Sequence, residues 1–287
     1  MQNTQDMIQR LNLSGSRLSK SHRRIAEYIL QHYDKAVFMT AAKLGEMVNV
    51  SESTVVRFAV ALGYEGYPEL QQALQELVRH RLTATQRFEM SSDISQEEVL
   101  STVLKADMQN IRSTIDGIDN AAFLRAVQVI SGARRIYILG LRSAAPLAQF
   151  MAHYLSFIFS NVTLVTSGVS DVFEQLSRIG EDDVLIGISF PRYSSRTIEA
   201  MSFARSRHAQ VIGLTDGPMS PLHEVADICL SMRTDMASFV DSMAAPMSVI
   251  NALIVALGIQ NREALNARFK QLEEVWDAYS VYMNEGK

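Results

Sequence analysis

The sequence contains a single cysteine, Cys229, among its 287 residues. One thiol cannot form an intramolecular disulfide, and no group of Cys and His residues has the spacing of a structural metal site. We therefore expect no bound metal and no other cofactor, and we expect Cys229 to fill space in the core.

Long apolar runs and targeting signals are also missing. The most apolar stretch, residues 244–259, is interrupted by Pro, Ser and Asn and falls short of a clean membrane span. The N-terminus lacks the basic-then-apolar layout of a secretory signal, which predicts a cytoplasmic protein without a membrane partner. A hydrophobic content of 47% with 20% charged residues is typical of a globular chain with an ample core, and 287 residues favour two domains.

The sequence has no strong excess of either charge, because its formal net charge is only −4. Residues 1–90 carry 11 Lys and Arg against 9 Asp and Glu, whereas the remaining residues carry 16 against 22. This asymmetry is modest, and on its own it is weak evidence for binding of nucleic acid by the N-terminal part.

Residues 1–82 predict a helical domain that contains a helix-turn-helix. Residues 40–48 form one predicted helix, Asn49 and Val50 a turn, and Ser51 the cap of a second helix over residues 51–63. Asn suits such a turn because it tolerates left-handed backbone. The second helix places an apolar set on one side, consisting of Val55, Phe58, Ala59 and Leu62. The alternative is a plain helical hairpin with a solvated polar face.

In a helix-turn-helix, the second helix lies in the major groove with its first residues towards the base edges. We therefore expect the polar side of residues 51–63 to read DNA, through Ser51, Ser53, Thr54 and Arg57. Contacts to the DNA phosphates are expected from Lys20, Arg23 and Lys43. Each of these side chains could instead be ordinary solvated surface.

Residues 83–96 are polar and aperiodic, and we interpret them as a linker. From residue 97 to residue 287 the pattern alternates between helices and short apolar strands, the latter at 135–140, 161–166, 183–189, 210–215 and 227–232. This alternation predicts an α/β domain with a doubly wound, five-stranded parallel sheet. The apolar helix predicted over 241–259 needs cover on nearly all sides. Either it joins two subunits, or it is enclosed against one face of the sheet.

Hydroxyl side chains follow two of the predicted strands, at the turns into the next helices. Arg142 and Ser143 follow the strand at 135–140, and a cluster of Ser194, Ser195 and Thr197 follows the strand at 183–189. Open α/β sheets bind ligands at the carboxyl ends of their strands, and helix N-termini favour anions. The two turns, with Arg142, Arg192 and Arg196 beside them, therefore suggest one shared ligand with a phosphate group. Alternatively, the hydroxyls are ordinary helix caps.

Several segments together resemble the RpiR family of bacterial transcriptional regulators. They are LSKSHRRIAEYIL and VSESTVVRFAVALGYEGYPEL in the helical part, and GLRSAAPLA, SSRTIEA and LTDGPMSPLHEVADICL in the α/β part. The similarity extends from about residue 15 to residue 260, and its second segment is very specific to the family. The resemblance implies a dimeric or tetrameric protein that binds operator DNA and senses a phosphorylated sugar or amino sugar through a sugar-isomerase-type (SIS) domain.

The resemblance also assigns residues to the phosphate site. SIS domains usually carry Ser-x-Ser-Gly-x-Thr-x-Glu, in which Ser194, Thr197 and Glu199 match the second Ser, the Thr and the Glu. Ser195 replaces the Gly, and Arg192 stands at the first Ser. Alternatively, Ser189 takes the first role, with residues 191–192 as an insertion. In the first turn Ser143 matches the family's Ser, and Arg142 replaces a usual Gly. The additional arginines suit a ligand with two anionic groups, such as a phosphate and a carboxylate.

Two other functions are compatible with the sequence. A sugar-phosphate isomerase would need a base to move a proton between adjacent carbons, for which the candidates are Glu199, Glu174, His153 and His223. None of them lies in a motif that requires catalysis, and His153 is expected to be a core residue. A protein-interaction module without a ligand would make the hydroxyl turns simple caps.

Overall fold

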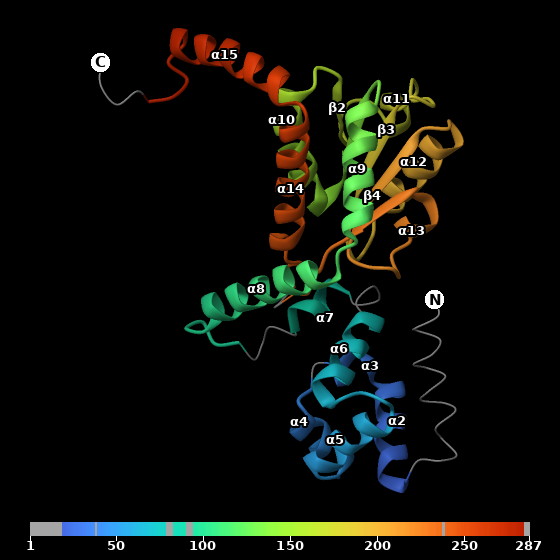
Figure 1. Ribbon diagram of the computed structural model, residues 1–287. Helices are drawn as coiled ribbons and strands as arrows, with labels where there is room; N and C mark the ends of the chain where they lie inside the picture. Colours follow the sequence, from blue (N-terminus) through green and yellow to red (C-terminus); the bar gives the residue numbers. More distant parts are fainter. Residues whose placement is uncertain (1–18, 38, 79–82, 90–93, 237–238, 284–287) are drawn as a thin grey trace. The chain divides into compact units, whose positions relative to one another are not determined.

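The computed structural model describes residues 19–37, 39–78, 83–89, 94–236 and 239–283 (Figure 1). The chain divides into two compact units, Met1–Gln96 and Glu97–Lys287. Residues 1–18 of the predicted helical domain lie outside the described residues.

The first unit is helical in its described part. Its helices are α2 (Lys20–Gln31), α3 (Tyr33–Ala36), α4 (Ala41–Val48), α5 (Glu52–Ala61), α6 (Tyr67–Val78) and α7 (Ala84–Glu89). Helix α7 lies in the stretch that we predicted as an aperiodic linker. Its residues include the good helix formers Gln, Arg and Glu, and a helix of six residues is too short to show an apolar period.

Four helices of this unit, α2, α4, α5 and α6, each turn one side to its core, and α6 contributes the buried Leu70 and Leu74. Ile25 and Ile29 of α2, Leu44 of α4 and Phe58 of α5 are all almost completely buried. Each of these helices places apolar residues three or four positions apart, so that one stripe faces the core. The predicted apolar side of α5 is confirmed in full, because Val55, Phe58, Ala59 and Leu62 are all buried.

The second unit is organised around a parallel sheet of five strands. The strands are β1 (Ile136–Gly140), β2 (Val162–Val165), β3 (Val184–Ile188), β4 (Gln210–Thr215) and β5 (Ile228–Ser231). They lie in the order β2-β1-β3-β4-β5, and every neighbouring pair is parallel. The predicted fold class is thus confirmed, with a helix-turn-helix unit followed by a doubly wound α/β unit.

Helices cover both faces of the sheet because successive side chains of a strand point to opposite sides. Ile136 and Ile138 pack in the core beneath α9 (Asn120–Gly132), α10 (Ala145–Ile158) and α14 (Ala244–Gln260). Tyr137 and Leu139 pack on the other side with α11 (Val172–Gln175), α12 (Ser195–Ser206) and α13 (Leu222–Val225). The remaining helices of this unit are α8 (Val99–Gly117), the 3-10 turn η2 (Arg142–Ala144) and α15 (Arg262–Ala278).

Two predicted elements differ from the structure. Between β2 and β3, where the alternation predicts a full helix, the structure has only the single turn of α11. Helix α14 is not enclosed, because Val255 and Ile259 are exposed on the side opposite its buried residues. The interpretation of α14 as a fully enclosed helix is therefore wrong.

Within the described residues no single helix has both the length and the apolarity of a membrane span. Among the described helices, only the pair α14 and α15 has the length and the apolarity of a membrane span when taken together, and the two helices are bent by 99° relative to each other.

Candidate functional site

The turn between α4 and α5 has the backbone that a tight helix-turn-helix requires. Asn49 ends α4 in the left-handed conformation, with φ 54° and ψ 55°, as its side-chain type predicts. Gly45 of α4 lies so close to the returning chain that a Cβ atom would be 2.8 Å from the Val50 carbonyl oxygen. A larger residue at position 45 would therefore force the two helices apart.

The polar side of α5 presents the predicted base-reading residues. Ser53 and Arg57 are exposed, and Thr54 is half-buried. Arg57 folds back along the helix, where its Nε donates to the Ser53 carbonyl oxygen at 3.2 Å and its Nη2 to Thr54 Oγ1 at 3.4 Å. Ser51 occupies the N-cap position, but the expected capping bond to the backbone is absent. Its Oγ pairs instead with Ser53 Oγ at 2.9 Å and Thr54 Oγ1 at 2.8 Å.

The three cations predicted to contact DNA phosphates are all on the surface of the same unit. Lys20 and Arg23 lie exposed on α2, and Lys43 lies exposed on α4, where it forms an ion pair with Glu46 at 3.2 Å. Such an exposed pair is worth little, so it does not hinder Lys43 from contacting a phosphate.

The two hydroxyl-bearing turns of the second unit emerge from neighbouring strands. Strands β1 and β3 pair in parallel, with Gly140 opposite Ile188, so both turns leave the same edge of the sheet. After β1 the chain crosses to β2 on one side of the pair, and after β3 it crosses to β4 on the other side. This point, where the strand order reverses, is where open α/β sheets bind their ligands.

An arginine in the left-handed conformation lies in each of these turns. Arg142 has φ 57° and Arg192 has φ 64°, and both side chains are exposed. A non-glycine residue in this region costs about 1–3 kcal/mol and persists where the surroundings impose it, most often at functional sites. The left-handed backbone at Arg142 is compatible with the resemblance, which places Arg142 where a Gly is usual.

Three hydroxyl side chains lie along the β3–α12 turn, and two of them accept hydrogen bonds from its backbone. Ser189 is 4% exposed, and its Oγ accepts a hydrogen bond from the Ser194 N–H at 3.2 Å. Ser194 caps α12, with its Oγ accepting from the Thr197 N–H at 3.4 Å. Thr197 is completely buried, and its Oγ1 has no hydrogen-bond partner within the described part of the chain. Buried hydroxyls are normally paired, so the Thr197 hydroxyl requires an explanation.

The remaining predicted ligand residues are either exposed or engaged with each other on the surface. Ser143 in η2 and Ser195 in the first turn of α12 are exposed. Glu199 and Arg196 form an ion pair with each other at 3.4 Å. Arg196 therefore belongs to a surface network and is not, in this arrangement, directed to the turns.

That network continues to the helix on the β2 side. Arg196 also bonds the Asp171 carboxylate, and its guanidinium lies 4.5 Å from the centre of the Phe173 ring. The Phe173 N–H, followed by the Arg196 side chain, lowers the pKa of Asp171. Asp171 and Glu174 form a capping box at the start of α11.

Sequence reasoning missed a polar pair beside the β3–α12 turn. Tyr193 Oη donates to Asp216 Oδ1 at 2.7 Å, and Thr215 Oγ1 lies 3.2 Å from the same carboxylate oxygen. Asp216 lies directly after β4, within the segment LTDGPMSPLHEVADICL that carries the family resemblance. The resemblance of this segment to the family could have pointed to Asp216, but it did not assign a role to that residue.

The candidates for acid–base catalysis do not converge. Glu199 is paired with Arg196, and Glu174 Oε2 accepts from the Asp171 N–H at 3.0 Å. His153 is exposed on α10, beside the rings of Tyr154 and Phe157, so its expected placement in the core is wrong. His223 is also exposed, and its Nε2 lies 3.4 Å from Ser231 Oγ. Burial lowers the pKa of His223.

Comparison with known domains agrees with both units. Residues 5–80 match the helix-turn-helix domain of the rpiR family, and residues 129–256 match the SIS domain. The chain belongs to the RpiR family.

Relatives in the RpiR family are similar over nearly their whole length. HTH-type transcriptional regulators HexR of Pseudomonas aeruginosa and of Escherichia coli are each 26% identical to this chain. The first alignment covers 94% of this chain and 95% of that protein, and the second covers 94% and 93%.

Solved structures show the same fold. The sugar isomerase domain of an RpiR transcription factor from Sphaerobacter thermophilus is 25% identical, with a TM-score of 0.59, and the match covers 62% of this chain and 99% of that one. The Vibrio vulnificus NanR protein complexed with ManNAc-6P is 20% identical, with a TM-score of 0.58, and the match covers 97% and 100% of the two chains.

Proposed function

We propose that this protein is a DNA-binding transcriptional regulator whose SIS domain binds a phosphorylated sugar. The observation that carries the proposal is the buried Thr197 hydroxyl at the point where the strand order reverses. A phosphate oxygen would accept its hydrogen bond and those of the free backbone N–H groups at the start of α12. NanR, which has the same fold, has been solved in complex with a phosphorylated amino sugar.

The ligand that fits the two turns best carries a second anionic group. Arg142 and Arg192 are exposed at the ends of the two central strands, each held in a strained backbone conformation. Guanidinium groups bind carboxylates and phosphates through two parallel hydrogen bonds. We therefore favour a phosphosugar that also bears a carboxylate or a second phosphate. Ser143 would contribute a further hydroxyl from the first turn.

The SIS unit acts as a sensor and not as an isomerase in this proposal. Isomerisation needs a base within reach of the sugar carbons, and the candidate carboxylates Glu174 and Glu199 are engaged in a capping box and an ion pair. The curated relatives are named as transcriptional regulators. Incubation with a panel of sugar phosphates tests this point, because turnover at an enzyme-like rate contradicts a pure sensor.

The DNA-binding unit would dock α5 in the major groove of an operator, as helix-turn-helix proteins do. Ser53, Thr54 and Arg57 would then reach the base edges, and Lys20, Arg23 and Lys43 would neutralise phosphates. Regulation of this kind takes place where the DNA is, so the proposal places the protein in the cytoplasm.

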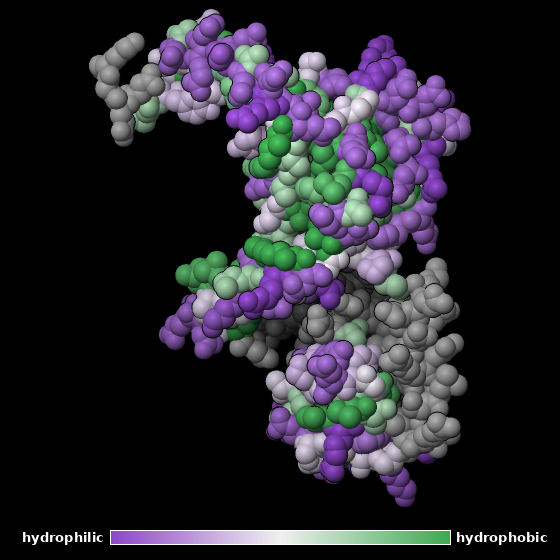
Figure 2. All heavy atoms as spheres, viewed as in Figure 1, coloured by the Kyte–Doolittle hydropathy of each residue, from purple (hydrophilic) through white to green (hydrophobic). Residues whose placement is uncertain are grey.

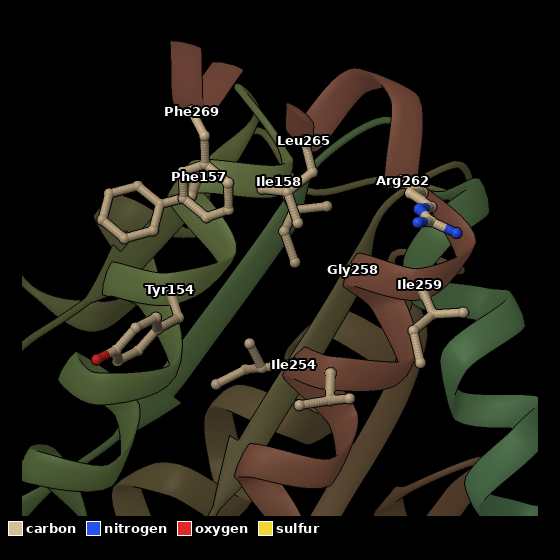
Figure 3. A pocket seen from close by; sticks show the side chains of 10 residues that line it. Tyr154, Phe157, Ile158, Ile254, Gly258, Ile259, Arg262, Leu265 and Phe269 are labelled. Atoms are coloured by element: carbon tan, nitrogen blue, oxygen red, sulfur yellow. The ribbon is translucent and has the colours of Figure 1, made fainter. Parts of the chain in front are cut away.

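We further propose that the protein is a homo-oligomer joined through the flank that carries α14. A groove of about 370 Å³ is lined almost entirely by apolar side chains of α10, α14 and α15, including Phe157, Ile259 and Phe269 (Figure 3). No residue of α15 is buried. Figure 2 shows further hydrophobic residues along α8, where Leu100, Leu104 and Met108 are exposed. Exposed apolar side chains gathered in this way are typical of a surface that binds another protein, which favours a second copy of the chain as its cover.

Sedimentation of a groove variant tests the oligomer. Ile259 is 71% exposed, so Ile259→Asp leaves the fold intact while placing a charge in the proposed interface. The expected result is a smaller species than the wild type at the same concentration. Leu124→Asp, at an exposed apolar residue of α9, is the control and keeps the wild-type size. Equal sedimentation of wild type and Ile259→Asp would exclude this interface.

A thermal-shift screen against phosphorylated sugars tests the sensor itself. A ligand present at 100 times its dissociation constant stabilises the folded state by about 2.7 kcal/mol, which raises the melting temperature by an easily measured amount. The panel includes each sugar without its phosphate, and sugars with and without a carboxylate. Stabilisation by none of them would favour the interaction module, in which the hydroxyl turns are only caps.

A further inference from the structure

Two valines lie exposed on the side of α5 that faces away from the core. Val56 is 38% exposed and Val60 is 54% exposed. They are four residues apart, so they lie one above the other on the helix surface. Ser53 and Arg57, the predicted base-reading residues, lie on the same side of the helix. The surface of α5 expected to enter the major groove is thus partly apolar.

The fold of the N-terminal unit does not account for these two valines. The core side of α5 is already supplied by Val55, Phe58, Ala59 and Leu62, all of which are buried. Valine is also a weaker helix former than Ala, Lys or Glu, because its branched side chain loses rotamer freedom in a helix. On the exposed side of a short helix, Val56 and Val60 therefore give the isolated unit no advantage in stability.

Chemistry limits what the two side chains can recognise in DNA. A valine has no hydrogen-bond donor or acceptor, and it is too short and too apolar to bind a phosphate. Among the groups that base pairs present in the major groove, the C5-methyl group of thymine is the apolar one. A valine on the reading side of α5 can therefore distinguish thymine from the other bases by contact with that methyl group.

We propose that Val56 and Val60 form a methyl-reading strip that sets the preference of this protein for thymine at defined operator positions. Val56, closer to the N-terminus of α5, contacts the thymine methyl in the part of the site that Ser53 and Arg57 also read. Val60, one turn later, contacts a methyl group on a neighbouring base pair. The inference rests on the docking of α5 in the major groove and adds the apolar half of its readout.

The experiment removes one methyl group at a time from the DNA. A duplex bound specifically by the full-length protein is first isolated by selection from random sequences. Each thymine of that duplex is then replaced by deoxyuridine, which preserves the base pair and lacks only the C5-methyl group. Burial of one methyl is worth about fourfold in affinity, so the wild type is expected to lose about that factor at one or two positions.

The protein variants then assign each sensitive position to a side chain. Val56→Ala is expected to bind the parent duplex more weakly and to lose the uracil effect at one position, while Val60→Ala loses it at another. Both substitutions favour the helix, so weaker binding cannot be attributed to unfolding. Val169→Ala, at a fully exposed valine of the second unit, is the control and keeps the wild-type pattern.

Two results would overturn the inference. One is a wild-type protein that binds every uracil-substituted duplex as tightly as the parent. The other is a Val56→Ala, Val60→Ala double variant that retains the full uracil effect at every position where the wild type shows it. In either case the valines would not be reading thymine, although α5 could still dock through Ser53 and Arg57.

Discussion

Tyr193 Oη donates a hydrogen bond of 2.7 Å to Asp216 Oδ1 and so ties the β3–α12 turn to the end of β4. Tyr193 lies between Arg192, whose backbone is left-handed, and Ser194, which caps α12. Asp216 is itself positioned by the neighbouring Thr215 hydroxyl, which in turn lies 2.6 Å from Ser220 Oγ. The bond therefore holds the turn in the conformation that presents Ser194 and the backbone of α12.

Tyr193→Phe is expected to weaken binding of the phosphosugar about tenfold. A hydrogen bond to a charged group contributes about 1.5–3 kcal/mol, and its loss allows the strained turn to relax away from the binding conformation. Titration calorimetry measures the effect with any ligand found in the thermal-shift screen. Tyr279→Phe, at an exposed tyrosine after α15, is the control. If Tyr193→Phe bound the ligand as tightly as the wild type, the Tyr193–Asp216 hydrogen bond would not position the site.

Arg57→Ala is expected to abolish specific binding to the operator, while the fold and phosphosugar binding survive. Arg57 is exposed on α5, and a bidentate contact from Arg to guanine is worth about 1–3 kcal/mol of discrimination. Electrophoretic mobility shifts with specific and random duplexes measure the loss. Arg268→Ala, at an exposed arginine of α15, is the control. Operator affinity equal to that of the wild type would place Arg57 outside the reading face.

The sequence was sufficient wherever a periodic apolar pattern determines the structure. The spacing of Val55, Phe58 and Leu62 predicted the buried side of α5, and the unbroken apolar run at Val184–Ile188 predicted the central strand. Alternation of helix and strand then determined the parallel sheet, because parallel strands need a crossover between them.

Contacts between side chains far apart in the sequence could not be predicted in this way. Tyr193 and Asp216 are 23 residues apart, and only the pairing of β3 with β4 brings them together. Ser51 was expected to cap α5, but its hydroxyl bonds the side chains of Ser53 and Thr54 instead. Such competition between near-equal hydrogen bonds depends on rotamers that a sequence pattern does not specify.

The stability of the N-terminal unit is expected to decrease as the pH falls below about 6.5. Burial, followed by the positive charge of Arg57, lowers the pKa of His22 from its ordinary value of 6.5. The unfolded chain therefore binds more protons than the folded chain between the two pKa values, so stability is complete above about 6.5 and decreases as the pH falls towards the folded pKa. Denaturant unfolding at pH 7.5 and pH 5.5 measures the difference.

His22→Gln is the matched variant for this pH dependence. It removes the titrating ring, so its loss of stability between the two pH values is expected to be smaller than that of the wild type. His32→Gln, at an exposed histidine just after α2, is the control and follows the wild-type profile. If His22→Gln and the wild type lost the same stability on acidification, His22 would not be the group that titrates.

Asp183 is expected to be a major contributor to the stability of the sheet. Its side chain is completely buried and accepts from Arg134 Nε at 3.0 Å, Arg134 Nη2 at 2.8 Å and the Gly180 N–H at 2.9 Å. Arg134→Ala leaves this buried carboxylate without its counter-charge, which is expected to be the more destabilising of two substitutions in this pair. The half-exposed guanidinium keeps its contact with water in Asp183→Asn, so that variant is expected to lose less, about 2 kcal/mol. Urea unfolding that ranked the two variants in the opposite order would contradict this assignment.

Calorimetric titration of a phosphosugar into the wild type and into Thr197→Val tests the proposed phosphate site most directly. The substitution removes a buried hydroxyl that has no partner in the described part of the chain, so the folded protein should be as stable as the wild type or slightly more stable. Thr197→Val is expected to bind the ligand at least tenfold more weakly than the wild type, and the sugar without its phosphate is expected to bind to neither protein. Equal affinity of the two proteins for the phosphosugar would contradict the proposed phosphate site.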